Sequence, residues 1–156
     1  MRRFEPQPDG AVVAQIEEAE VALLSTLARQ AADVVAAADF DDPAVGRILP
    51  DAYPDDPEAS AEFRRFTQAD LAGRKLANAG VILEALDEVR EGELRLRPEQ
   101  VQAWLRSLTD VRLILATRLG IQAEGDEDRP GVDPMMRDVY DWLGFVQNSL
   151  IEAIDA

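Results

Sequence analysis

The residue types on which most enzyme chemistry depends are missing from this sequence. It contains no cysteine and no histidine among its 156 residues. Histidine is the usual side chain that titrates near neutral pH and the commonest zinc ligand, and cysteine supplies thiolate nucleophiles and zinc ligands. The composition therefore excludes Ser-His-Asp and Cys-His catalysis and most transition-metal sites. We predict no catalytic residue, no cofactor and no metal for this chain.

Carboxylates and arginines are the side chains that remain for binding. Between residues 55 and 75 they form a candidate contact for a protein partner or an anion, which consists of Asp55, Asp56, Arg64, Arg65 and Arg74. Glu62, Asp70 and Lys75 lie in the same stretch and could complete a polar pocket for an anion or an acidic peptide. The alternative is a set of surface pairs along helices, each of which contributes a few tenths of a kcal/mol.

A run of aspartates is the second group that could bind a ligand, here a hard cation such as Mg²⁺ or Ca²⁺. Its members are Asp39, Asp41, Asp42, Asp51, Asp55 and Asp56. The run lacks the alternate acidic residues around a central glycine that a calcium loop requires. We therefore interpret it as a solvated connection that could contact a partner. Paired carboxylates of the glycosidase kind are expected by chance among 31 acidic residues.

The charge balance argues against polyanionic partners. The chain has 16 basic and 31 acidic residues, a formal net charge of −15. Such a surface repels a phosphate backbone and anionic lipid unless a local arginine patch outweighs it. No hydrophobic run follows Arg2 and Arg3, and no apolar stretch reaches the roughly 18 residues that span a bilayer. We expect a cytoplasmic protein without a membrane segment.

The element that must position these side chains is predicted most clearly at residues 97–120. Pro98 suits a first helical position, and Gly120 supplies the left-handed conformation that ends many helices. Apolar residues recur at steps of three and four, which predicts one buried stripe. The stripe consists of Val101, Trp104, Leu105, Leu108, Val111, Leu115 and Leu119.

Further helices are predicted at residues 17–38, 58–66 and 68–90, and from Asp133-Pro134 to the end, with a short turn after Asp42-Pro43. Thr67 and Asp70 have the spacing of a capping box for the helix at 68–90. Gly73 and Gly80 lie inside that helix, where glycine costs roughly 1 kcal/mol relative to alanine. We expect these glycines to permit close backbone approach, which would place this helix at the centre. Residues 122–133 are predicted to form a loop.

A small β element is predicted at the start of the chain. Pro8-Asp9-Gly10 is a strong turn signal between two short extended runs, residues 2–7 and 11–16. A two-stranded hairpin is marginal by itself. The alternating pattern at 93–97 is the candidate third strand. The sequence therefore predicts a mainly α fold, a single-domain helical bundle over residues 1–156 with four or five principal helices and a small N-terminal β-hairpin.

Two groups on the last two long helices have both a structural and a functional interpretation. Arg112 and Arg118 lie beside the apolar stripe, where buried guanidinium groups need carboxylate partners. The carboxylates available as partners are Asp110, Asp138 and Asp141, and structural ion pairs are the favoured interpretation. The aromatic residues could line a ligand pocket, but we interpret them as core packing; they are Trp104, Tyr140, Trp142 and Phe145.

Several blocks, taken in order, resemble an actinobacterial domain family of unknown function. They are Arg2-Arg3-Phe4 with Asp9-Gly10, DPAVGRILPDAYPDDPEASAEFRRFTQADL, WLRSLTDVRLILATRLG and VYDWLGFVQNSL. The resemblance covers nearly the whole chain and implies a mainly helical protein. The family is often encoded near the ClpS adaptor of the Clp protease, and it includes the oxidative-stress regulator AosR, which acts through protein contacts. Thiol-based sensing of that branch does not carry over, because this chain has no cysteine.

Three classes of function follow from these observations. The first, which we favour, is a non-enzymatic regulatory or adaptor protein that binds another protein, in stress response or regulated proteolysis. The second is a DNA-associated transcriptional regulator, which would need an arginine cluster on one exposed helix face. The third is an enzyme or small-molecule binder that uses carboxylates and arginines in a concave pocket. A homodimer is a further expectation, because exposed apolar helix faces commonly pair.

Overall fold

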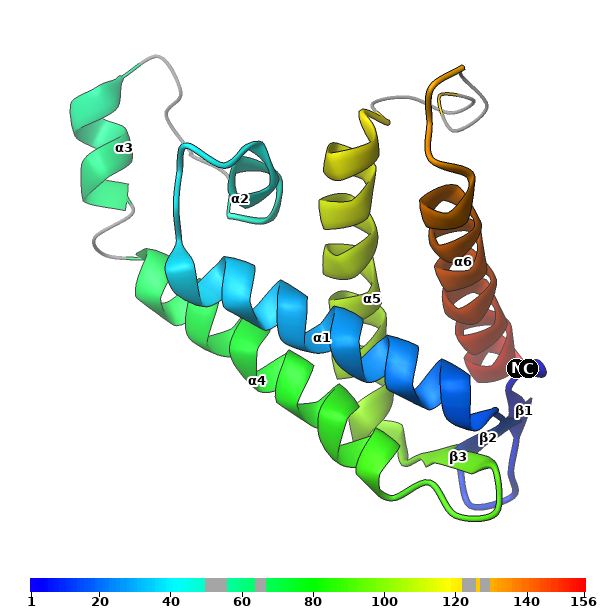
Figure 1. Ribbon diagram of the computed structural model, residues 1–156. Helices are drawn as coiled ribbons and strands as arrows, with labels where there is room; N and C mark the ends of the chain where they lie inside the picture. Colours follow the sequence, from blue (N-terminus) through cyan, green and yellow to red (C-terminus); the bar gives the residue numbers. More distant parts are fainter. Residues whose placement is uncertain (50–55, 64–66, 122–125, 127–129) are drawn as a thin grey trace.

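Four long helices make up most of the protein, and a three-stranded sheet lies at one end of them (Figure 1). The computed structural model describes residues 1–49, 56–63, 67–121, 126 and 130–156. The long helices are α1 (Glu18–Ala37), α4 (Ala69–Asp87), α5 (Pro98–Leu119) and α6 (Pro134–Asp155). Two short helices, α2 (Pro43–Ile48) and α3 (Pro57–Phe63), lie between α1 and α4 in the chain. The mainly α fold class is confirmed.

Helix α5 is the centre of the bundle, because it packs against α1, α2, α4 and α6. Its ends are those that the sequence predicted. Pro98 occupies the first turn, the Arg97 backbone N–H donates to Gln100 Oε1 at 2.8 Å, and Gly120 ends the helix with φ +74°. The predicted central place of α4 is therefore wrong, and so is the reason given for it. Gly73 and Gly80 are exposed, and a Cβ atom at either would meet no other atom within 4 Å.

The remaining helix predictions hold with small shifts. Asp42 caps α2 by accepting from the Ala44 N–H at 3.0 Å, and Asp133 caps α6 by accepting from the Met135 N–H at 2.9 Å. Gln68, the residue before α4, already has helical dihedrals, and the predicted cap at Thr67 stays a prediction. Most of the predicted loop at 122–133 lies outside the described residues.

The sheet ties the start of the chain to the turn between α4 and α5. Strands β1 (Glu5–Pro6), β2 (Val12–Gln15) and β3 (Glu93–Leu96) are antiparallel in the order β1-β2-β3, with Val12 opposite Leu96. The predicted hairpin and its third strand are both confirmed. Alternation explains the burial, because Leu94 and Leu96 point into the core while Arg95 is exposed.

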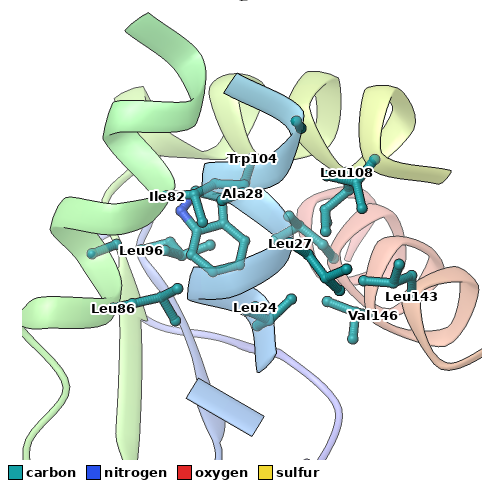
Figure 2. Close-up of a cluster of buried hydrophobic side chains, with 14 of the residues drawn as sticks. Leu24, Leu27, Ala28, Ile82, Leu86, Leu96, Trp104, Leu108, Leu143 and Val146 are labelled. Atoms are coloured by element: carbon teal, nitrogen blue, oxygen red, sulfur yellow. The ribbon is translucent and has the colours of Figure 1, made fainter. Parts of the chain in front are cut away.

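The hydrophobic core forms where α1, α4, α5 and β3 meet, and Trp104 lies inside it. Figure 2 shows the indole surrounded by Leu24 and Ala28 of α1, Ile82 of α4 and Leu96 of β3. Trp104 has no exposed surface. Its assignment to core packing is therefore confirmed. None of the described helices is both long enough and apolar enough to cross a bilayer.

Candidate functional site

A polar groove runs between α4 and α5 on the side away from α1. Its volume is about 430 Å³. Three basic side chains and one carboxylate are among its lining residues, which are Leu71, Arg74, Lys75, Asn78, Arg106, Thr109 and Asp110. The lining therefore carries two net positive charges in a chain whose net charge is −15.

The floor of the groove is an ion pair between the two helices. Lys75 Nζ donates to both carboxylate oxygens of Asp110, at 2.8 and 2.9 Å, and both side chains are largely buried. Burial raises the pKa of the Asp110 carboxyl, and the hydrogen bonds and charge of Lys75 offset only part of this rise. On the inner side of the pair, Ala28, Ala31 and Ala32 of α1 close the space. The pair thus separates the groove from the core.

Two arginines stand on the walls of the groove without a carboxylate partner. Arg74 on α4 and Arg106 on α5 are exposed, and neither forms an ion pair with any residue within the described ranges. Arg74 and Asn78 are one turn apart on α4, as Arg106 and Asp110 are on α5, so each pair shares a helix face. The groove therefore presents guanidinium groups from both sides to whatever enters it.

The order of the elements explains why these residues meet. Helices α4 and α5 are joined through the short strand β3 and run antiparallel (Figure 1). Residues at similar distances from the turn at Gly92 therefore lie opposite each other, and Lys75 lies 17 residues before that glycine while Asp110 lies 18 after it. The ion pair between them fixes the relative position of the two helices along their length.

A second polar group lies between α5 and α6, and it corrects the predicted partners of Arg112. This side chain packs over the Tyr140 ring, with Cζ 4.5 Å from the centroid, and donates to Gln147 Oε1 at 3.3 Å. Gln147 Nε2 in turn donates to Thr109 Oγ1 at 2.6 Å. An aromatic ring and an amide therefore hold Arg112 in place of a carboxylate. The face of an aromatic ring attracts a cation, so the ring can stabilise the charge of this half-buried arginine.

A third polar group attaches α2 to the end of α5, and here the predicted partners of Arg118 were also wrong. Arg118 donates from both terminal nitrogens to Asp42, at 2.6 and 2.7 Å. The hydrogen bonds from Arg118 lower the pKa of Asp42 to about 2, with a further contribution from the Ala44 N–H. Arg47 donates to the Ile121 carbonyl at 3.2 Å. Asp42 therefore both caps α2 and attaches it to the C-terminal end of α5.

Of the five predicted contact residues, only Asp56 and Arg74 belong to the described part of the chain, so the contact as a whole stays a prediction. Asp55, Arg64 and Arg65 lie outside the described residues. Asp56 is exposed and accepts from the Ala59 N–H at 3.1 Å, so it caps the start of α3. Arg74 lines the α4–α5 groove together with Lys75. In the described part of the chain, no three acidic side chains converge as a metal site would require.

Sequence reasoning missed the contribution of α5 to this groove. Arg106, Thr109 and Asp110 were considered as parts of an apolar helix, and Asp110 was assigned to an arginine. The signal that could have found them is the antiparallel pairing of α4 and α5 across the predicted third strand. That pairing places Asp110 opposite Lys75, the chain's one lysine.

Comparison with known proteins decides the family. Residues 1–154 match the family described as a domain of unknown function, DUF2017. The chain belongs to this family. No solved structure matches the chain.

Curated relatives of this DUF2017 chain come from mycobacteria. The oxidative stress regulators AosR of Mycobacterium tuberculosis and Mycobacterium bovis are each 30% identical over 125 residues, which is 70% of this chain and 57% of theirs. A Mycobacterium leprae protein given the same name provisionally is 30% identical over 131 residues, 74% of this chain and 60% of its own. The chain thus spans less than two thirds of the length of these relatives.

Proposed function

We propose that this protein is a non-enzymatic regulator that acts by binding another protein in a stress-related process. The observation that carries the proposal is the α4–α5 groove, in which Arg74 and Arg106 lack a carboxylate partner among the described residues while Lys75 and Asp110 satisfy each other. Relatives named as oxidative stress regulators support the class of role. A link to regulated proteolysis and a homodimer stay predictions.

The geometry gives less support to the enzyme or small-molecule alternative. A carboxylate that acts as acid or base needs to face its substrate. The carboxylate in the groove is Asp110, whose two oxygens both accept from Lys75. Among the aromatic residues that could have lined a pocket, Trp104 is buried in the core, and Tyr140 and Trp142 are partly buried against it. Phe145 is exposed, so the core packing predicted for it is wrong.

The DNA-binding alternative would need a broader basic surface than the groove provides. A duplex presents a row of phosphates that extends well beyond two arginines, and the surrounding surface carries the excess of acidic residues. We expect no gel shift with duplex DNA even at low salt. A shift at low salt that disappears in an Arg74→Glu, Arg106→Glu variant would favour this alternative.

The test of the proposed function is capture of a partner followed by reconstitution. The tagged protein is cross-linked in cells of its source organism, under normal and oxidising conditions, and the captured proteins are identified by mass spectrometry. We expect one reproducible partner that also binds the purified chain in a titration, with recovery that changes on oxidation. Recovery of no reproducible partner, or of none that binds when purified, would contradict the proposal.

A further inference from the structure

We infer that the α4–α5 groove binds an acidic peptide segment, in which side-chain carboxylates are held by Arg74 and Arg106. The inference rests on the proposed function, which it deepens by stating the chemistry of the partner. It concerns one surface, the groove lined by residues of α4 and α5 described above.

The first argument is charge complementarity within the groove. Of its three cations, Lys75 is neutralised by Asp110, so the two arginines hold the net positive charge. An arginine can bind a carboxylate through two parallel N–H···O bonds, which are stronger than bonds between neutral groups. Two arginines on facing walls can therefore hold two carboxylates of one extended or helical segment.

The second argument concerns the remaining lining residues. Leu71 and Asn78 lie on the α4 wall with Arg74. Leucine offers an apolar contact, and an asparagine amide can both donate to and accept from a peptide backbone. A groove of about 430 Å³ lies within the size range of built binding pockets, roughly 300–1,000 Å³. The mixture of apolar, amide and guanidinium groups suits a peptide better than a bare inorganic ion.

The third argument separates a short acidic peptide from a nucleic acid. The molecule has 31 acidic residues, which repel any long polyanion that extends over the surface. Electrostatic interactions between exposed charges are screened beyond about 8 Å at physiological ionic strength. A short segment confined to the groove therefore meets mainly the local arginines, whereas a duplex meets the acidic surroundings as well.

The test is a titration of the full chain with a short fluorescent peptide of alternating glutamate and alanine, followed by fluorescence anisotropy. We expect binding that weakens about tenfold or more in the Arg74→Glu, Arg106→Glu variant, since tenfold corresponds to about 1.4 kcal/mol and charged hydrogen bonds contribute about 1.5–3. The matched control is Arg2→Glu, Arg29→Glu, which changes the charge equally at exposed positions away from the groove. The control should bind as the unaltered chain does.

Further arms of the same titration identify the ligand and check the geometry. Arg74→Lys, Arg106→Lys keeps the charge and should weaken binding less than the glutamate variant but measurably, because lysine lacks the paired donors. A lysine–alanine peptide should not bind. Equal loss in the control variant, stronger competition by duplex DNA than by the unlabelled peptide, or full displacement by inorganic phosphate at the peptide's own concentration would each overturn the inference.

The outcome is separable from that of the proposed function. A captured and reconstituted partner whose binding is unchanged in the Arg74→Glu, Arg106→Glu variant would overturn the groove as the binding surface and leave the regulatory role standing. Peptide binding at the groove in the absence of any reproducible cellular partner would instead contradict the regulatory role. Thermal melts verify that the glutamate and lysine variants of Arg74 and Arg106 are folded. We expect melting temperatures near that of the unaltered chain, because both side chains are exposed.

Discussion

At the scale of single residues, Trp104 is the largest side chain that is fully buried in the described part of the chain. It has no exposed surface, and its indole N–H donates to none of the residues that the structure describes. Its contribution to stability therefore comes from packing and not from a hydrogen bond. This distinction can be tested, because phenylalanine retains most of the packing and lacks only the second ring and its donor.

We expect Trp104→Ala to lower the free energy of unfolding by about 3–5 kcal/mol. Trp104→Phe should cost much less, because no hydrogen bond is lost. Arg29→Ala, at an exposed position on α1, should stay within about 0.5 kcal/mol of the unaltered chain. Urea unfolding followed by far-UV circular dichroism, a signal of the backbone, measures the free energy of unfolding of all three variants. Equal losses for the alanine and phenylalanine variants would contradict the view that the packing retained by phenylalanine supplies most of the stability.

The Asp42 carboxylate both caps α2 and forms an ion pair with Arg118. Measurements at different pH values can distinguish the contributions of the cap and the ion pair to stability. The pKa of Asp42 is lowered from 3.8 to about 2, chiefly by its hydrogen bonds with Arg118. A folded-state pKa below the unfolded one adds stability that is complete above pH about 4 and is lost as the pH falls toward 2. Asparagine can still cap α2, but it carries no charge.

We therefore expect Asp42→Asn to be less stable than the unaltered chain at neutral pH, with a difference that shrinks as the pH falls from about 4 to about 2. Urea titrations of both proteins at a series of pH values measure the difference. An Asp41→Asn variant, at an exposed position next to the cap, serves as the control and should show no such change. A constant difference at every pH would mean that the ion pair adds no stability.

At the scale of elements, the glycines of α4 and α6 have opposite surroundings. A Cβ at Gly80 would meet nothing within 4 Å, whereas a Cβ at Gly144 would lie 3.1 Å from Arg112 Nη2. The sequence predicted close approach to the backbone at the glycines of α4, but it occurs at Gly144 of α6. There the Arg112 guanidinium of α5 lies against the α6 backbone and over the Tyr140 ring.

We expect Gly80→Ala to raise the free energy of unfolding by about 0.5–1 kcal/mol, the usual difference between the two residues inside a helix. Gly144→Ala should bring no such gain, because the new methyl group pushes the guanidinium away from the aromatic ring. Thermal melts of the two variants under one buffer provide the comparison. If Gly144→Ala proves as stabilising as Gly80→Ala, the packing of Arg112 between α5 and α6 is looser than the distances from Gly144 to Arg112 indicate.

Elements were largely predictable from sequence because their signals are local. Pro98, Gly120 and Asp133 mark helix ends by their own backbone preferences, and alternation marked the third strand. The partners of Arg112 and Arg118 were not predictable in this way. Arg112 lies over Tyr140, the neighbour of the predicted Asp141, because its partner is an aromatic ring and not a carboxylate. Arg118 pairs with Asp42, which lies 76 positions away beside another helix. The groove depends on such distant pairing too.

At the scale of the whole molecule, charge repulsion acts on every element. With 31 acidic against 16 basic residues, the compact chain brings many like charges close together. The described ion pairs relieve this only locally, and most of them are exposed, where such pairs contribute little.

We expect the melting temperature to rise when sodium chloride is raised from low to moderate concentration, because salt screens the repulsion. Potassium chloride should have the same effect at equal ionic strength, which would distinguish screening from specific binding of one cation. Calorimetry or circular dichroism at several salt concentrations measures it. A melting temperature that falls with either salt would mean that the exposed ion pairs outweigh the repulsion.

The two ends of the described chain lie beside each other (Figure 1). The Phe4 N–H donates to Ser149 Oγ at 2.7 Å, and Arg3 pairs with Glu152. A short flexible linker could therefore join them, and the chain could be reopened in another loop as a circular permutant. An immobilisation tag at either end would hold the protein by this corner and leave the start of α4, at the opposite side of the molecule, presented to the bulk solution.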